Sequence, residues 1–202
     1  MTIVEDMAQK EGKHIAKHEY WKKEGVEIKR LPLPVGDYVI YNDKVEEVVI
    51  RKEGRNIPVK KLDLLGTYSV TVDSKYGIEE LCADICGPQH ERFRDECILA
   101  QNNGIRLIIL VENEGGPVCK QKPNIVNKNV DEVRDLAHWI NPRLFVRTRY
   151  GQKYPNAVRG LQLMKAVITM NLKYGVEFAF CRPGEAGKKI LELLEQKDET
   201  DL

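Results

Sequence analysis

The chain has 202 residues, of which 42% are hydrophobic and 31% are charged, and its formal net charge is +1. These values are typical of a soluble globular protein with an ordinary core, and they exclude a global basic field as the sign of a nucleic-acid partner. No apolar run approaches the roughly 20 residues of a membrane span, and the N-terminus lacks the apolar region of a signal peptide. We therefore expect a cytoplasmic protein with no membrane association.

The first half of the chain is predicted to be one helix followed by strands. The helix covers 13–24 and ends at Gly25. Two short strands follow within 26–41, around two prolines, and two further strands are predicted over 45–51 and 67–75. We expect these strands to form an antiparallel run.

The second half alternates helices and strands. Over 78–86 the apolar residues recur with the spacing of a helix that has one buried stripe. The run at 105–112 is almost entirely apolar, as in a central strand that is buried on both faces. The remaining elements are predicted as helices at 91–103, 159–174 and about 185–197, and a strand at 176–181.

Residues 113–157 interrupt this alternation. They are rich in Gly, Pro and polar residues, with a short helix expected at 130–138 and a loop after it. A loop-rich segment of this length inside a compact domain is usually functional or mobile. We therefore predict one α/β domain over 1–202, with an insertion at about 113–157.

The five cysteines do not predict a covalent or zinc framework. Their count is odd, and the chain has no signal peptide, which argues against disulfides. Cys82 and Cys86 lie four apart, without a CxxC pair or matching histidines. We expect the cysteines to be small core residues.

A few polar residues fall where a metal-dependent site would need them. Asp37 follows Gly36 at the start of a strand, and Asp73 and Lys75 lie two apart on another strand, on one face and ~6.6 Å apart along it. Glu79 lies in the first turn of the next helix. A D-x-K tripeptide alone is more often a surface ion pair, and only the whole set favours a site.

These residue types suit phosphodiester hydrolysis. Mg²⁺ takes one or two carboxylates together with water and substrate phosphate. A neighbouring lysine can orient or deprotonate the attacking water, and the metal stabilises charge that develops on the phosphoryl oxygens.

The strings GDY, VDSKYGIEEL, ERFRDECILA and IRLIILVE resemble the nuclease domain of the XPF-type, ERCC4-like family of the PD-(D/E)xK superfamily. The segment 161–194 resembles the family's closing helix, strand and helix. The likeness covers nearly the whole chain apart from 113–157. It implies a restriction-endonuclease-like mixed β-sheet flanked by helices, organised as in short single-domain bacterial or phage members without a helix–hairpin–helix domain.

The family's hallmark is GD, then E-R-K-x-x-x-D. Asp37 matches the GD acid, the segment 73–75 takes the E-R-K place with Asp for Glu and Ser for Arg, and Glu79 takes the place of the final acid. Arg92 matches an arginine of the following helix.

The chain also departs from the family at its first strand, where a D-x-R-E pattern is usual. Here Glu5 and Asp6 are followed by Met7 and Ala8, and we choose Asp6 as the candidate ligand. The second departure is Ser74 in place of arginine, which bears on DNA contact.

The resemblance implies a metal-dependent, structure-selective DNA endonuclease of DNA repair, recombination or phage DNA processing. Mg²⁺ or Mn²⁺ would be the cofactor, with no nucleotide cofactor, and a homodimer is implied by the family's closing helices. The residues carried over are metal ligands Asp37, Asp73, Glu79 and Asp6; catalytic residues Asp73, Lys75 and Glu79; and, for phosphate contact, Arg92. Arg147 and Arg149 lie outside the resemblance, in a basic stretch at 143–159. Most charge clusters are solvated surface, and the alternative interpretation of this one is phosphate contact.

Two alternatives stay open. The altered first strand favours a nuclease-fold protein that no longer cuts but binds DNA or a partner. An RNA-processing nuclease of the same fold would use the same metal-site residues. Among the other candidates, we interpret His14 and His18 as surface histidines, and Glu112 as either a substrate-facing or an ordinary strand-end acid.

Overall fold

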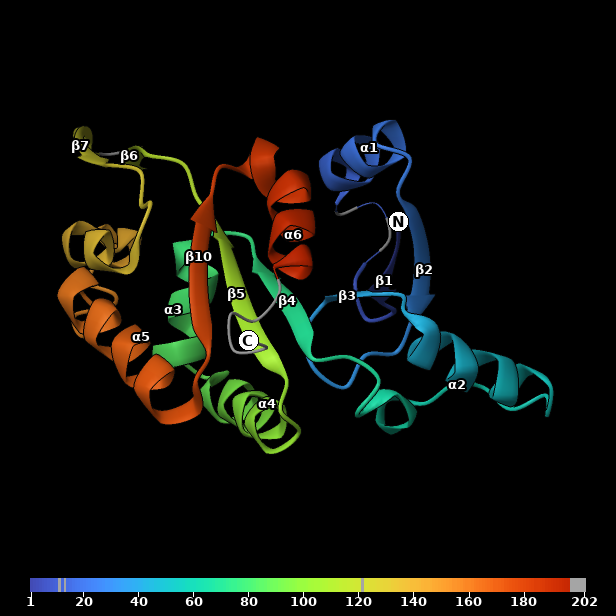
Figure 1. Ribbon diagram of the computed structural model, residues 1–202. Helices are drawn as coiled ribbons and strands as arrows, with labels where there is room; N and C mark the ends of the chain where they lie inside the picture. The colour runs from blue at the N-terminus through green and yellow to red at the C-terminus, as the bar shows by residue number, and fades with distance from the viewer. Residues whose placement is uncertain (11, 13, 121, 197–202) are drawn as a thin grey trace.

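The computed structural model describes residues 1–10, 12, 14–120 and 122–196. It contains a six-stranded mixed sheet in the order β10-β5-β4-β3-β1-β2, with helices on both faces (Figure 1). The predicted α/β architecture, a mixed β-sheet flanked by helices, is confirmed.

The sheet strands are β1 (Thr2–Asp6), β2 (Glu27–Leu31), β3 (Tyr38–Ile40), β4 (Val70–Lys75), β5 (Arg106–Glu112) and β10 (Glu177–Cys181). The α-helices are α1 (Ile15–Lys23), α2 (Asp43–Glu53), α3 (Ile78–Cys86), α4 (His90–Asn102), α5 (Gly160–Tyr174) and α6 (Ala186–Glu195). Of the predicted helix boundaries, residues 13 and 197 lie outside the described residues. Short 3-10 turns complete the core region at η1 (Lys61–Leu64) and η4 (Pro183–Glu185).

The strands of the first half do not form the antiparallel run that we expected. β3 is antiparallel to both β1 and β4, but β2 pairs with β1 in parallel. The prediction was wrong for β2 because α1 carries the chain from β1 across to the neighbouring position, and a helical crossover of this kind joins parallel strands.

The strand predicted at 45–51 is also wrong, because these residues belong to helix α2. Val45 and Val48, three residues apart, are buried on one helix face. Asn42 caps the helix, its side chain accepting a hydrogen bond from the backbone N–H of Val45 at 3.0 Å. The β-branched residues of this segment are typical of a strand, which explains the prediction. The cap at Asn42 instead stabilises the start of a helix.

The core has one layer on each face of the sheet. β5 serves both layers: Leu107 and Ile109 face the cluster under α3, α4 and α5, whereas Ile108 and Leu110 face the cluster under α1 and α6. The prediction of a central strand buried on both faces is confirmed. Among the cysteines, Cys82, Cys97 and Cys181 are buried as expected, and Cys86 is exposed.

Helices α1 and α6 approach each other closely, although they come from opposite ends of the chain. The indole N–H of Trp21 donates to the carbonyl of Gly187 at 2.8 Å. A Cβ atom at Gly187 would lie 3.3 Å from the Cα of Lys17, so a glycine there lets the two backbones come together.

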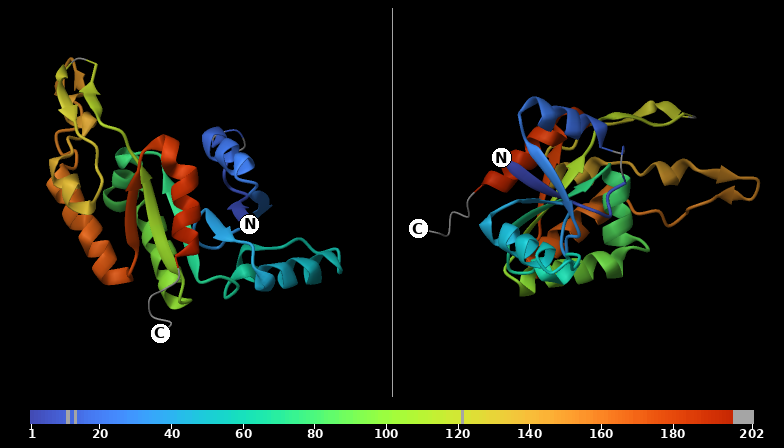
Figure 2. Two further views of the ribbon diagram at one scale, coloured as in Figure 1. Left: turned by 45° about the horizontal axis from the view of Figure 1, so that its top comes forward. Right: turned by 90° about the vertical axis from the view of Figure 1, so that its right-hand side faces the viewer.

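The segment predicted as an insertion forms two β-hairpins, which project from the body as separate arms (Figure 2). The first consists of β6 (Gly116–Cys119) and β7 (Lys122–Asn127), and the second of β8 (Arg147–Thr148) and β9 (Gly151–Gln152). The short helix expected at 130–138 is a 3-10 helix, η2 (Val133–His138), and the expected loop after it contains η3 (Pro142–Phe145) and the second hairpin. None of the described helices is long and apolar enough to cross a bilayer.

Candidate active site

A cavity of about 500 Å³ lies where the end of β4, the start of β3 and helix α4 meet. Its lining combines three cationic side chains with seven carboxylic acids. The acids are Asp6, Asp37, Asp73, Glu80, Asp95, Glu96 and Glu112, and the cations are Lys61, Lys75 and Arg92. Most of the residues predicted as site residues therefore share one cavity.

Gly36 sets the position of Asp37. Its φ is +71°, and an added Cβ would lie 2.1 Å from the hydroxyl oxygen of Thr71, so no larger residue fits. The backbone N–H of Gly36 donates to Glu96 at 2.9 Å, which draws that carboxylate to the same wall of the cavity. The pair of Gly36 and Asp37 thus positions two acids at the cavity, Asp37 itself and Glu96.

Both carboxylate oxygens of Asp37 accept hydrogen bonds. Oδ1 accepts from the side-chain amide of Gln9 at 2.5 Å, and Oδ2 accepts from the backbone N–H of Ser74 at 2.9 Å and from its hydroxyl at 3.4 Å. Burial and the nearby charge of Asp73 raise the pKa of Asp37 to about 8. The site therefore favours a positive charge near this carboxylate.

Asp73 and Lys75 lie on one face of β4, as their spacing predicts. The ammonium of Lys75 is 2.7 Å from Asp73 and 2.8 Å from Asp84, and all three side chains are buried. Burial alone would lower the pKa of Lys75, but the two carboxylates outweigh it and raise the pKa above its ordinary value. Lys75 therefore stays protonated. The pair of Asp73 and Lys75 is buried, and it is not the surface ion pair that an isolated D-x-K tripeptide usually forms.

Sequence reasoning missed Asp84 and Glu96. Asp84 lies within the buried stripe of α3, and an acid among apolar helix positions was a usable signal. Glu96 lies four residues after Arg92, on the same face of α4. Burial and the charge of Asp73 raise the pKa of Glu96. Its presence in the cavity depends on how α4 packs, which no local pattern gives.

Of the two acids at the end of β1, Asp6 lines the cavity, and its carboxylate accepts a hydrogen bond from the backbone N–H of Leu33 at 3.0 Å. Glu5 is instead paired with His18 at 2.9 Å and with Arg30 at 3.5 Å. The arrangement is consistent with choosing Asp6 as the candidate ligand.

Glu79 is not brought into this cavity. It is exposed and lines the next depressions, at the bases of the two hairpins. Its neighbour Glu80 lines the cavity and accepts a hydrogen bond from the backbone N–H of Tyr76 at 2.7 Å. The difference arises because Ile78 is buried and fixes the rotation of α3, which turns Glu79 away from Lys75.

Arg92 is exposed at the cavity rim, whereas Arg147 and Arg149 are exposed on the second hairpin and do not line the cavity. The surface position expected of His14 is wrong, because its side chain is buried and hydrogen-bonded to Gln9 at 2.9 Å. Glu112, at the end of β5, lines the cavity and forms a buried ion pair with Lys17 at 2.6 Å.

The donor chemistry of the cavity fits a hard divalent cation. Asp37 and Asp73 supply carboxylate oxygens, and Glu96 lies close enough for its pKa to respond to the charge of Asp73. Within the described residues no three acidic, histidine or cysteine side chains form a ready ligand cluster. Mg²⁺ commonly uses one or two carboxylates and completes its shell with water.

Comparison with known protein families gives a match to the ERCC4 domain over residues 6–193. The chain belongs to the ERCC4 domain family. The match begins at Asp6 and ends within α6, so it includes both the cavity and the two hairpins. The XPF-type nuclease domain identified from the GD and D-x-K motifs is confirmed.

Among solved structures, this ERCC4 domain is similar to XPF from Aeropyrum pernix, which was determined in complex with DNA. The two are 14% identical, with a TM-score of 0.49. The similarity covers 96% of this chain and 62% of the Aeropyrum chain. No curated protein matches the chain.

Proposed function

We propose that this ERCC4 domain is a metal-dependent DNA endonuclease that hydrolyses phosphodiester bonds. The observation that carries the proposal is the convergence of Asp37, Asp73 and Lys75 in one cavity, with Glu96 on its wall. Two acids and one lysine are the residues that such hydrolysis requires. Here Asp37 directly precedes β3, Asp73 and Lys75 lie on β4, and further hydrogen bonds and ion pairs hold them.

Asp37 and Asp73 would hold the cation, Mg²⁺ or Mn²⁺, with Asp6 or Glu96 as a further oxygen donor. When bound, the cation would supply positive charge for the phosphoryl oxygens. Glu79, predicted as a ligand, lies outside the cavity, so comparing Glu79→Gln with Glu80→Gln tests whether either acid contributes.

Lys75 would act as a cationic group and not as a base. Its raised pKa means that it carries a proton at neutral pH. A fixed ammonium can orient the attacking water and attract a phosphate oxygen, which are the roles of a preorganised donor. Asp84 and Asp73 hold it in place.

DNA contact would involve Arg92 at the rim and the two hairpin arms. Residues 115–130 contain three lysines and no acid, and residues 139–160 contain five cations and no acid. All eight are exposed. Such a concentration of cations fits phosphate contact, which carries a strong salt dependence. Arg147 and Arg149 are the two at the second hairpin.

The decisive experiment is cleavage of labelled single-stranded, duplex, flap and branched DNA, and of RNA, with Mg²⁺, Mn²⁺ or EDTA. Lys75→Met and Asp73→Asn proteins are measured beside it, with Lys188→Ala, on the exposed side of α6, as the matched control. We expect metal-dependent cutting that both site variants lose and the control keeps. The preferred substrate would also separate DNA from RNA processing and test structure selectivity.

A non-cutting DNA-binding or partner-binding protein is the second candidate, favoured by Met7 and Ala8 at the end of the first strand and by Ser74. Tight DNA binding without cutting in either metal would establish it. Unchanged cutting by a folded Asp73→Asn protein would refute the proposed site.

A further inference from the structure

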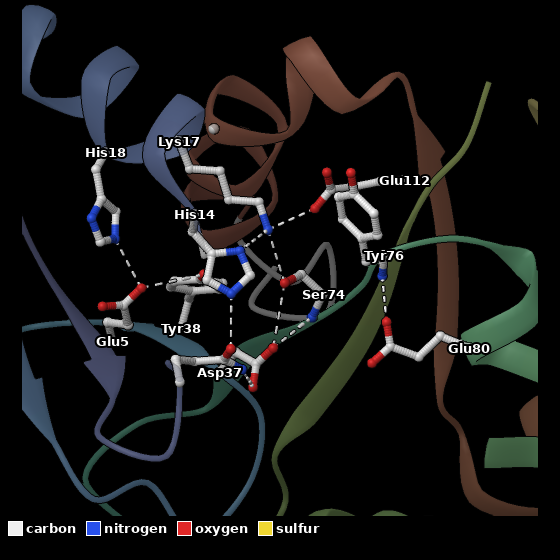
Figure 3. Close-up of polar contacts among 12 residues, drawn as sticks. Glu5, His14, Lys17, His18, Asp37, Tyr38, Ser74, Tyr76, Glu80 and Glu112 are labelled. Atoms are coloured by element: carbon white, nitrogen blue, oxygen red, sulfur yellow. Dashed lines mark hydrogen bonds and ion pairs between the residues drawn. The ribbon is translucent and has the colours of Figure 1, made fainter. Parts of the chain in front are cut away.

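The buried ammonium of Lys17 lies behind the cavity, where three partners share it. It is 2.6 Å from Glu112, 3.0 Å from the hydroxyl of Ser74 and 3.4 Å from Nδ1 of His14. Figure 3 shows Lys17 reaching down from α1 toward these residues. An ammonium has three protons, so each of these contacts uses one.

Two of these contacts continue to Asp37. On one side, the hydroxyl of Ser74 lies 3.4 Å from Oδ2 of Asp37. On the other, Nε2 of His14 is 2.9 Å from Oε1 of Gln9, whose amide nitrogen donates to Oδ1 of Asp37 at 2.5 Å. The five side chains form a closed ring, with Lys17 and Asp37 at opposite points.

We propose that Lys17, Ser74, His14 and Gln9 form a positioning ring that fixes the carboxylate of Asp37 for cation binding. This inference rests on the proposed function, since it concerns a ligand of the proposed site. Outer hydrogen-bond partners of a ligand commonly change metal affinity about 10–100-fold when they are removed.

The direction of each hydrogen bond fixes the chemical state of His14. Because the amide nitrogen of Gln9 donates to Asp37, its oxygen accepts, and Nε2 of His14 therefore carries the proton. Nδ1 then accepts from Lys17, so the imidazole is neutral. The ring thus requires one particular tautomer, which can be observed.

Ser74 connects the ring to the D-x-K segment of β4. It occupies the middle of the D-x-K segment, directly between Asp73 and Lys75, and its backbone N–H already holds Asp37. Its small hydroxyl leaves room for a cation from another element to approach. Lys17 takes that space, held there by the contact of α1 with Gly187.

The test measures two properties of the whole, metal-free protein and of its variants. Gln9→Leu breaks one side of the ring, Ser74→Ala breaks the other, and Ser74→Thr keeps the hydroxyl. Titration calorimetry with Mn²⁺ gives the dissociation constant. We expect it to rise about tenfold for Gln9→Leu and Ser74→Ala, and to stay within about threefold for Ser74→Thr. Equal dissociation constants in all four proteins would overturn the ring.

Nitrogen-15 NMR of the imidazoles separates failure of the ring from failure of the proposed function. Wild-type protein should show His14 neutral and protonated at Nε2, with the tautomer lost in Gln9→Leu. If the wild type binds no Mn²⁺, the proposed function fails, and the tautomer still decides whether the ring exists. A wild-type His14 protonated at Nδ1 would overturn the ring whatever the metal result.

Lys17 itself is tested with its partner, because removing it alone leaves Glu112 buried without a counter-charge. The Lys17→Met, Glu112→Gln double variant keeps the region neutral. We expect its Mn²⁺ activation constant for cutting to rise about tenfold, with kcat recovering at saturating Mn²⁺. A loss of thermal stability alone, with the activation constant unchanged, would assign Lys17 a structural role and overturn its place in the ring.

Discussion

The cavity and the two hairpin arms of this ERCC4 domain differ in almost every physical property. The cavity is rich in carboxylates, most of its polar groups are held by at least one partner, and it lies at the sheet. The arms and the segments beside them, residues 115–130 and 139–160, carry eight exposed cations and no acid, and the two hairpins project away from the sheet. The net charge of +1 does not show this difference, because the acids of the cavity and the cations of the arms lie in different parts of the molecule and offset each other in the sum.

Under the proposed function, the difference separates two tasks, cutting in the cavity and DNA binding at the arms. Charges that are buried and hydrogen-bonded act over short distances and need exact geometry, whereas exposed cations act over about a Debye length and tolerate imprecise placement. We therefore expect variants in the cavity to change the rate of cutting, and variants in the arms to change binding and its salt dependence.

The largest effect should come from Asp73→Asn, which removes a charge from the cavity and leaves the arms intact. Cutting should fall by about 10²–10³-fold or more, because the proposed cation loses a ligand and Lys75 loses a partner. DNA affinity, measured by fluorescence anisotropy in EDTA, should stay close to that of the wild type. A parallel loss of affinity and of thermal stability would make Asp73 a structural residue.

Gly36→Ala should be the next most damaging change, and it tests how the cavity is built. The added methyl group would overlap Thr71, and the left-handed backbone disfavours any side chain. We expect a clearly lower melting temperature together with a loss of cutting. Gly184→Ala, where an added Cβ meets nothing within 4 Å, is the matched control and should melt close to the wild type.

The Arg147→Ala, Arg149→Ala double variant addresses the arms alone. The slope of log affinity against log salt should become shallower by about 2, because each arginine that is removed takes away one ionic interaction with a phosphate. Cutting at saturating DNA should be unchanged, since neither side chain lines the cavity. An unaltered salt slope would remove these arginines from the DNA interface.

The smallest effect concerns stability and its dependence on pH. The pKa of Asp37 is raised to about 8, whereas an unfolded Asp titrates near about 3.9. Between these values the folded protein holds a proton that the unfolded chain releases, so this group lowers stability as pH rises. In EDTA, the melting temperature of Asp37→Asn relative to that of the wild type should therefore be higher at pH 8 than at pH 5 by a few degrees, because the loss of an accepted hydrogen bond costs the same at both pH values. The same difference at both pH values would contradict the raised pKa.

Local patterns predicted the parts of the site that lie within one element. Asp73 and Lys75 share a face because strand side chains alternate, and the Gly36-Asp37 pair marked the start of a strand. The D-x-K spacing was therefore enough to predict that Asp73 and Lys75 lie together on β4. It could not predict that Asp84 and Glu96 approach them, because their approach depends on how α3 and α4 pack against the sheet.

The errors have physical causes of the same kind. Glu79 and Glu80 are adjacent, and only the burial of Ile78 decides which of them turns toward Lys75. The strand prediction at 45–51 followed β-branched residues and overlooked the cap at Asn42. The arms were predicted as loop because short two-stranded hairpins with few apolar residues leave a weak pattern.

The packing of α1 against α6 affects when, during synthesis of the chain, the site around Asp37 can be completed. Lys17 is held beside Ser74 by a helix whose packing partner includes Gly187, 170 positions later in the chain. A ribosome that has not yet released α6 holds a chain with all the carboxylates of the cavity but without the surface that seats α1. Such long-range closure is formed late in folding. We therefore expect the proposed cutting activity to appear only after α6 has been made, and a protein ended at residue 175 should lack the His14 tautomer.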